Sequence, residues 1–149
     1  MLTYVVMKRF LERGIILSGE VLVKILSQAY EQKKTLPIVS FSSFFEQKKV
    51  GFRLNNDVSA DIIYHTLMCI QRKTCVQDVL VEVLKVDSPN NDGAFSDCVY
   101  ILANGTKQQV KEWVQPLHPK RVKQGYQHGT PIDAPQLKND YHVFAVTWS

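Results

Sequence analysis

The chain has 149 residues, of which 45% are hydrophobic and 21% are charged. This size and balance fit one globular core, and they exclude a disordered or low-complexity chain. No apolar run reaches the roughly 18 residues that a transmembrane helix needs. The first residues also lack the basic-then-apolar order of a secretory signal peptide. We therefore expect a single cytoplasmic domain over residues 1–149 with no segment in the membrane.

The three cysteines are Cys69, Cys75 and Cys98, an odd number without the spacing of a disulfide framework. In a chain without a signal peptide, this pattern indicates reduced thiols.

The formal net charge is +4, and it is unevenly distributed along the chain. Residues 61–97 contain three Lys or Arg and six Asp or Glu. Residues 98–128 contain five Lys or Arg and one acidic residue, Glu112. Blocks of charge often become charged faces that attract a partner of the opposite sign. The alternative is a solvated surface of mixed sign.

The N-terminal third of the chain gives mixed signals. Side-chain types in residues 3–13 alternate in a way that suits a strand, but the glycine that follows, Gly14, is typical of the end of a helix. Both a strand and a helix remain possible here. Residues 19–34 predict a helix, because a serine can cap it and its apolar residues recur at helical spacing. Residues 37–45 fit a bent strand or a loop that buries aromatics, and residues 50–54 fit a short strand.

The middle of the chain predicts a helix over 59–73 and a strand over 79–86. Ser59 is placed to cap the helix, although the same residues also alternate in a way that would suit a strand. Apart from Glu82 and Lys85, the strand is apolar on both faces and should therefore lie inside the sheet. Residues 87–97 predict a long polar loop.

The last part of the chain begins with a strand at 98–103 and a helix at 106–117. Thr106 and Gln109 have the spacing of a capping box. Trp113 falls on the apolar face of this helix, so we expect it in the core, where its replacement by Ala would cost about 3–5 kcal/mol.

Residues 118–138 predict a second long polar loop, and residues 141–148 predict a closing strand. Together these elements predict an α+β fold with a mainly antiparallel sheet, about three helices packed on it, and a C-terminal β-β-α-β unit. If the last strand lay at a sheet edge, it would allow self-association with a second copy.

Motifs for chemistry are weak. His65 and Cys69 share a helix face and Cys75 follows, but the set lacks the ligand spacing of a zinc site. The chain also lacks a glycine-rich phosphate loop and a nucleophile elbow. We expect no metal, no cofactor and no catalytic set.

One group of polar residues stands out as a candidate binding patch. Its cations can neutralise phosphates, and its tyrosine can stack on a base. The members of this candidate patch are Lys107, Lys111, His118, Lys120, Arg121, Lys123, Tyr126 and His128.

The resulting expectation is a small non-catalytic protein that binds or regulates a protein partner. Its long polar loops and blocked charge would supply the recognition surface. The alternative is a nucleic-acid-binding module that uses the basic patch around residues 107–123. A third hypothesis, an enzyme with His118 or His128 as general base, has less in its favour.

Overall fold

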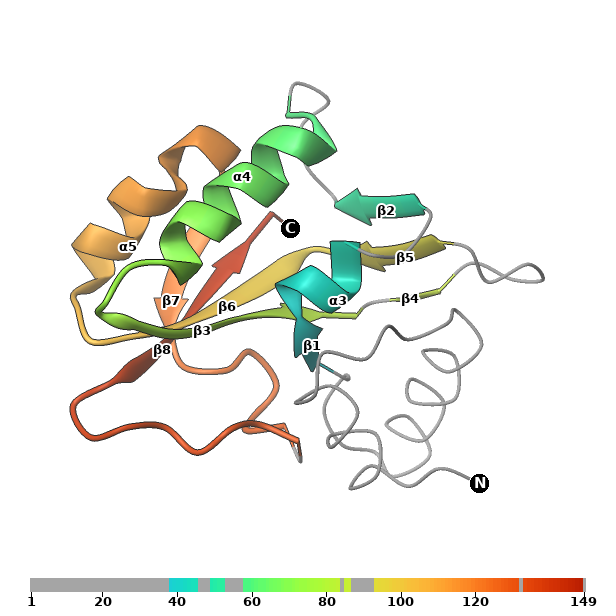
Figure 1. Cartoon of the computed structure of the whole chain (residues 1–149). Coiled ribbons are helices and arrows are strands. Elements are labelled where there is room, and N and C mark those ends of the chain that lie inside the picture. The colour runs from blue at the N-terminus through green and yellow to red at the C-terminus, as the bar shows by residue number, and fades with distance from the viewer. Residues whose placement is uncertain are drawn as a thin grey trace.

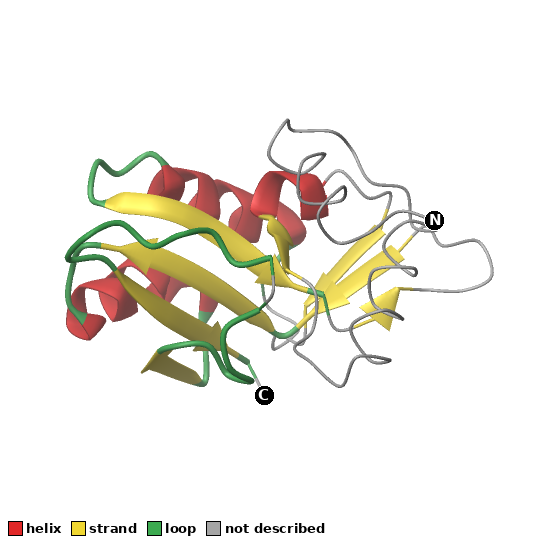
Figure 2. Cartoon of the chain, turned by 90° about the horizontal axis from the view of Figure 1, so that it is seen from below, coloured by secondary structure: helices red, strands yellow, loops and turns green. Residues whose placement is uncertain are grey.

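The structure is a computed structural model that describes residues 38–45, 49–52, 58–83, 85–86, 93–131 and 133–148. Within them the chain forms a five-stranded antiparallel sheet with helices on one face, so the expected α+β class is confirmed (Figures 1 and 2). The predictions for residues 3–13 and 19–34 lie outside the described residues. No helix in the described part is long and apolar enough to cross a membrane.

The large sheet has the strand order β1-β3-β6-β8-β7, and all its neighbouring strands are antiparallel. Its strands are β1 (Ile38–Ser40), β3 (Val76–Glu82), β6 (Cys98–Ala103), β7 (Arg121–Gln124) and β8 (His142–Thr147).

A small second sheet has the order β2-β5-β4. It consists of β2 (Lys49–Phe52), β5 (Gly93–Ser96) and β4 (Lys85–Val86), with β2 parallel to β5. The strand expected near 50–54 therefore exists, but it belongs to this sheet and not to the main one. The prediction of one loop over residues 87–97 is also wrong, because β5 occupies the second half of this segment.

Helix α4 (Ala60–Gln71) forms where its cap and its apolar spacing predict it. The Ser59 hydroxyl accepts a hydrogen bond from the Ile62 N–H, which satisfies a backbone donor at the helix start. Ile63, Leu67 and Ile70 are buried at intervals of four and three residues. The helix therefore lays one apolar stripe on the sheet.

Helix α5 (Lys107–Val114) begins with the expected capping box. Thr106 Oγ1 accepts from the Gln109 N–H at 3.2 Å, and Gln109 Oε1 accepts from the Thr106 N–H at 2.9 Å. Val110 and Val114 are buried against the sheet, and a 3-10 turn (Gln115–Leu117) ends the helix. The predicted helix over 106–117 is thus confirmed.

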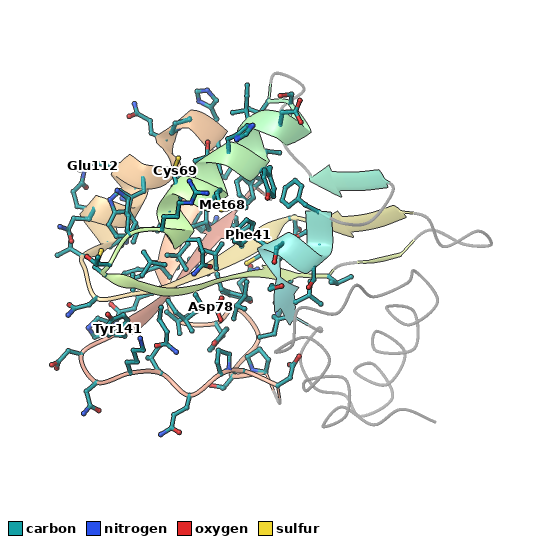
Figure 3. All side chains as sticks on the ribbon, in the orientation of Figure 1. Phe41, Met68, Cys69, Asp78, Glu112 and Tyr141 are labelled. Carbon is teal, nitrogen blue, oxygen red and sulfur yellow. The ribbon has the colours of Figure 1, made fainter. Side chains whose placement is uncertain are left out.

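Residues 37–45 had two open interpretations, and neither was complete. Ile38–Ser40 form β1, and Phe41–Phe45 form the short helix α3. The Phe41 ring of α3 meets the Tyr64 ring of α4 at 5.9 Å, and Figure 3 shows Phe41 beside α4. A helical turn that follows the strand therefore buries Phe41 and Phe44 and half-buries Phe45.

The sheet is buried on both faces. On the helix side, Val79, Val99, Ile101 and Phe144 pack beneath α4 and α5. We call this packing the helix-side core. On the other face a second cluster contains Leu80, Cys98, Tyr100, Leu102, Val143 and Ala145, with Tyr126 and Ala134 packed against it. The connection from β7 to β8 runs along this far face (Figure 1).

Three expectations are corrected by the C-terminal part of the sheet. Residues 118–138 are not one loop, because β7 lies within them; with Val122 as its only apolar residue, β7 is too short and polar to show a clear pattern. The strand at 141–148 is not an edge, because β8 lies between β6 and β7. Trp113 is only half-buried, whereas Trp148 is buried and its Nε1 donates to the Leu117 carbonyl at 2.8 Å.

Replacement of Leu67 by Ala tests the position of α4 on the sheet. The Leu67 side chain is fully buried, so Leu67→Ala should lower the free energy of unfolding by about 2–5 kcal/mol. Ile62→Ala is the matched control on the same helix, because Ile62 is 46% exposed and should change stability by about 0.5 kcal/mol or less. Urea denaturation measures both, and equal losses would contradict this packing.

Candidate functional site

Six of the eight candidate patch residues line one open groove of about 580 Å³ at the β7 edge of the main sheet. Lys107 and Lys111 come from α5, His118 follows the 3-10 turn, and Lys120, Arg121 and Lys123 come from β7 and its approach. Gln115, Pro119 and Val122 complete the lining. We call this site the basic groove.

The local fold explains how residues distant in sequence meet in the groove. Leu117 is buried and anchors the end of α5, and His118 then takes a left-handed conformation with φ 51°. This turn reverses the chain, so that β7 runs back beside the helix that precedes it. The Lys120 N–H donates to the Thr147 carbonyl at 2.8 Å, which fixes the start of β7 against β8.

Alternation along β7 places its side chains on two faces. Val122 belongs to the helix-side core, so Arg121 and Lys123 project toward the opposite face. These two cations also line a smaller hollow of about 230 Å³ on that face, together with Tyr126 and Ala145. The positive charge therefore continues around the β7 edge from α5 to the far face.

In the described part of the chain, no acidic side chain pairs with the cations of the basic groove. None of the described residues that line it is Asp or Glu, and among the described residues these cations form no ion pair. Glu112, the acidic residue on α5, lies on the outer side of that helix (Figure 3). The groove thus concentrates positive potential that a partner's negative charge can neutralise.

Tyr126 and His128, the other two candidates, lie outside the basic groove. The Tyr126 ring is half-buried and meets the Tyr100 ring edge-on at 4.8 Å. Burial, with Asp133 and Asp78 nearby, raises the pKa of Tyr126 to about 12. His128 is exposed, and its Nε2 lies 3.8 Å from Glu82 Oε1. Both residues are therefore directed toward a second cluster.

That second cluster is centred on the buried carboxyl group of Glu82. The Tyr100 hydroxyl donates to Glu82 Oε2 at 2.5 Å and accepts from the Gln127 N–H at 3.3 Å. Burial raises the pKa of Glu82, which the Tyr100 hydrogen bond and nearby His128 partly oppose. The sequence signal for this cluster was a Glu within a mainly apolar run, but its partners come from β6 and from the segment that follows β7.

The weak metal pattern is not assembled into a site. Among the described residues, no group of three or more His, Cys, Asp or Glu side chains is placed to hold a metal ion. Cys69 is exposed, Cys75 is half-buried and Cys98 is buried, and all three are free thiols. Burial raises the pKa of the Cys98 thiol, which keeps it protonated and poorly nucleophilic.

The family described as "Uncharacterized protein YfbO family" matches residues 16–146 of the chain. The chain belongs to this family. The chain is also 26% identical over 117 residues to a protein of Escherichia coli strain K12 named "Uncharacterized protein YfbO", a match that covers 75% of this chain and 82% of that protein. No solved structure is significantly similar to the chain.

Replacement of Glu82 by Gln should change how stability depends on pH. A pKa raised in the folded state means that the folded protein binds the proton more tightly than the unfolded chain. The stability from protonated Glu82 is therefore complete below the ordinary pKa of 4.5 and is lost as pH rises through the folded-state pKa. Glu82→Gln removes this loss, and its amide oxygen can still accept from Tyr100.

Urea denaturation at a series of pH values from 4 upward measures this effect. The free energy of unfolding of wild type should fall relative to Glu82→Gln as pH rises above 4.5. Glu112→Gln is the control, because Glu112 is exposed on α5, and its curve should run parallel to wild type. Parallel curves for Glu82→Gln as well would contradict the burial of an ionisable Glu82.

Proposed function

We propose that this chain is a non-catalytic protein-binding factor whose basic groove takes an acidic segment of a partner protein. The observation that carries the proposal is the gathering of five lysine and arginine side chains around one groove whose described lining contains no Asp or Glu. Complementary charge of this kind speeds association and selects the partner more than it adds raw affinity.

The positions of the lysines on α5 support a binding role. Lys107 occupies the first turn of α5, where the helix dipole disfavours a cation by roughly 0.3–1 kcal/mol. Lys107 and Lys111 are four residues apart, so their like charges repel on the same face of the helix. Lys111 also lies in the last turn, where the helix dipole favours a cation, so Lys107 is the lysine placed against the dipole. A negatively charged partner would relieve both repulsions.

The surroundings of the groove favour an acidic protein segment over a nucleic acid. Binding of single strands relies on aromatic rings on which bases stack. None of the described groove-lining residues is Phe, Tyr or Trp. The nearby Tyr126 packs edge-on against Tyr100 and is half-buried.

Charge reversal at Lys123 tests the proposal. The probe is a fluorescently labelled peptide with a repeating Glu-Glu-Val-Val sequence, which places glutamates on both faces of an extended strand, and its affinity is measured by anisotropy over a salt series. Lys123→Glu should weaken binding by about tenfold or more at low salt, with a smaller effect at high salt because ions screen the interaction. Lys138→Glu makes the same change of charge outside the groove and should have little effect.

The same assay includes a labelled single-stranded oligonucleotide. Equal weakening by Lys123→Glu and Lys138→Glu would show that the peptide is attracted by the overall positive charge of the protein and not by the basic groove. This result would contradict the proposal. Tighter binding of the oligonucleotide than of the peptide, with a steep salt dependence, would replace the proposal with a nucleic-acid-binding role.

A further inference from the structure

Strand β7 is an edge of the main sheet in the described part of the chain. Its strand partner there is β8, and its other side borders the basic groove. An edge strand presents backbone N–H and C=O groups that can pair with another extended chain. The basic groove therefore has a hydrogen-bonding strand on one side and helix α5 beside it.

The register of β7 against β8 identifies the backbone groups that face the groove. The Gly125 N–H donates to the Val143 carbonyl at 2.7 Å, in line with the pairing of Gln124 with Phe144. In an antiparallel pair, residues bonded to the neighbouring strand alternate with residues whose backbone groups point away from it. Lys123 and Gly125 thus face β8, and the backbone N–H and C=O of Val122 and Gln124 point away from β8 to the outer side of β7, where Val122 lines the basic groove.

The charges beside this edge decide what can pair with it. Side chains of an added strand would alternate between two faces. On the helix side they would meet Lys107 and Lys111, and on the far side they would meet Arg121 and Lys123. Both faces of the added strand therefore meet cations, so the matching segment carries acidic residues on both of its faces.

The same charges argue against a second copy of β7 as the occupant. Pairing of two β7 strands would bring Arg121 and Lys123 of each copy close to those of the other, and like charges across a strand pair are destabilising. Cations on an edge strand are a known protection against such self-pairing. The expected self-association through 141–148 also lacks a basis, because β8 is internal.

We propose that an acidic, extended segment of a partner protein binds as an additional β-strand along β7. This inference rests on the proposed function and adds the geometry of binding: the backbone of Val122 and Gln124 holds the segment, and the flanking lysines and arginine select its charge. Pairing through the main chain would give affinity with little dependence on the exact side chains, whereas charge would give specificity.

Gln124→Pro against Gln124→Ala tests the strand pairing within the protein. Proline removes the Gln124 N–H that points to the outer side of β7, whereas alanine keeps it. Both variants lose the contact of the Gln124 side chain with His142 Nδ1 at 3.2 Å, so their comparison isolates the backbone donor. The glutamate–valine peptide should bind Gln124→Ala about as well as wild type and Gln124→Pro about tenfold more weakly.

A pair of modified peptides gives the same test on wild-type protein and does not depend on the folding of a variant. One peptide is N-methylated at every odd position and the other at every even position. Strand addition uses the amides of only one of these sets, so one peptide should lose binding by at least about tenfold and the other should keep it.

The outcomes separate the two proposals. If the unmodified peptide binds in a Lys123-dependent manner but both methylated peptides bind equally well, strand addition is overturned and the acidic-segment function stands. If Gln124→Pro folds and binds as tightly as Gln124→Ala, strand addition is likewise overturned. If the unmodified peptide does not bind at low salt, both proposals fall.

Discussion

The pairing of β8 between β6 and β7 is the constraint on which the rest of the molecule depends. Six residues of β8 pair with β6 and four pair with β7, so the last strand of the chain joins the two parts of the sheet. Five consecutive positions of β8, Val143–Thr147, are buried, as suits a strand covered on both faces. Because β8 takes the internal place, β7 is left at the edge.

The end of β8 also fixes the walls of the basic groove. The Trp148 Nε1 donates to the Leu117 carbonyl at the end of α5, and the Thr147 carbonyl accepts from the Lys120 N–H at the start of β7. Two hydrogen bonds from neighbouring residues thus hold the helix and the strand that together carry the cations. Loss of the C-terminal strand would therefore remove the groove as well as the strand that joins β7 to β6.

Sequence alone predicted the elements whose signals are local. Helix α5 was identified from its capping box and apolar spacing, and β6 from a run of residues that are all buried. The membership of the candidate patch was also largely recovered, because Lys107 to Lys123 are close in sequence and a single reversal of the chain at His118 brings them together.

The remaining features depend on pairings between distant segments, which a single sequence does not encode locally. The strand order that makes β7 an edge is one such feature, and the contact between Glu82 and Tyr100 is another. The choice of Trp148 over Trp113 as the buried tryptophan is a third, because it depends on where β8 ends relative to Leu117. Periodicity shows which face of an element is apolar but not how deeply that face is covered.

The central claim is that β7 presents alternate backbone groups to a groove of positive charge. Amide hydrogen exchange on the free protein, resolved by residue, tests it most directly. The amides of Lys123 and Gly125 should be protected by their bonds to β8, and those of Val122 and Gln124 should exchange much faster. Equal protection at all four positions would show that the outer side of β7 is already covered, and it would contradict the account.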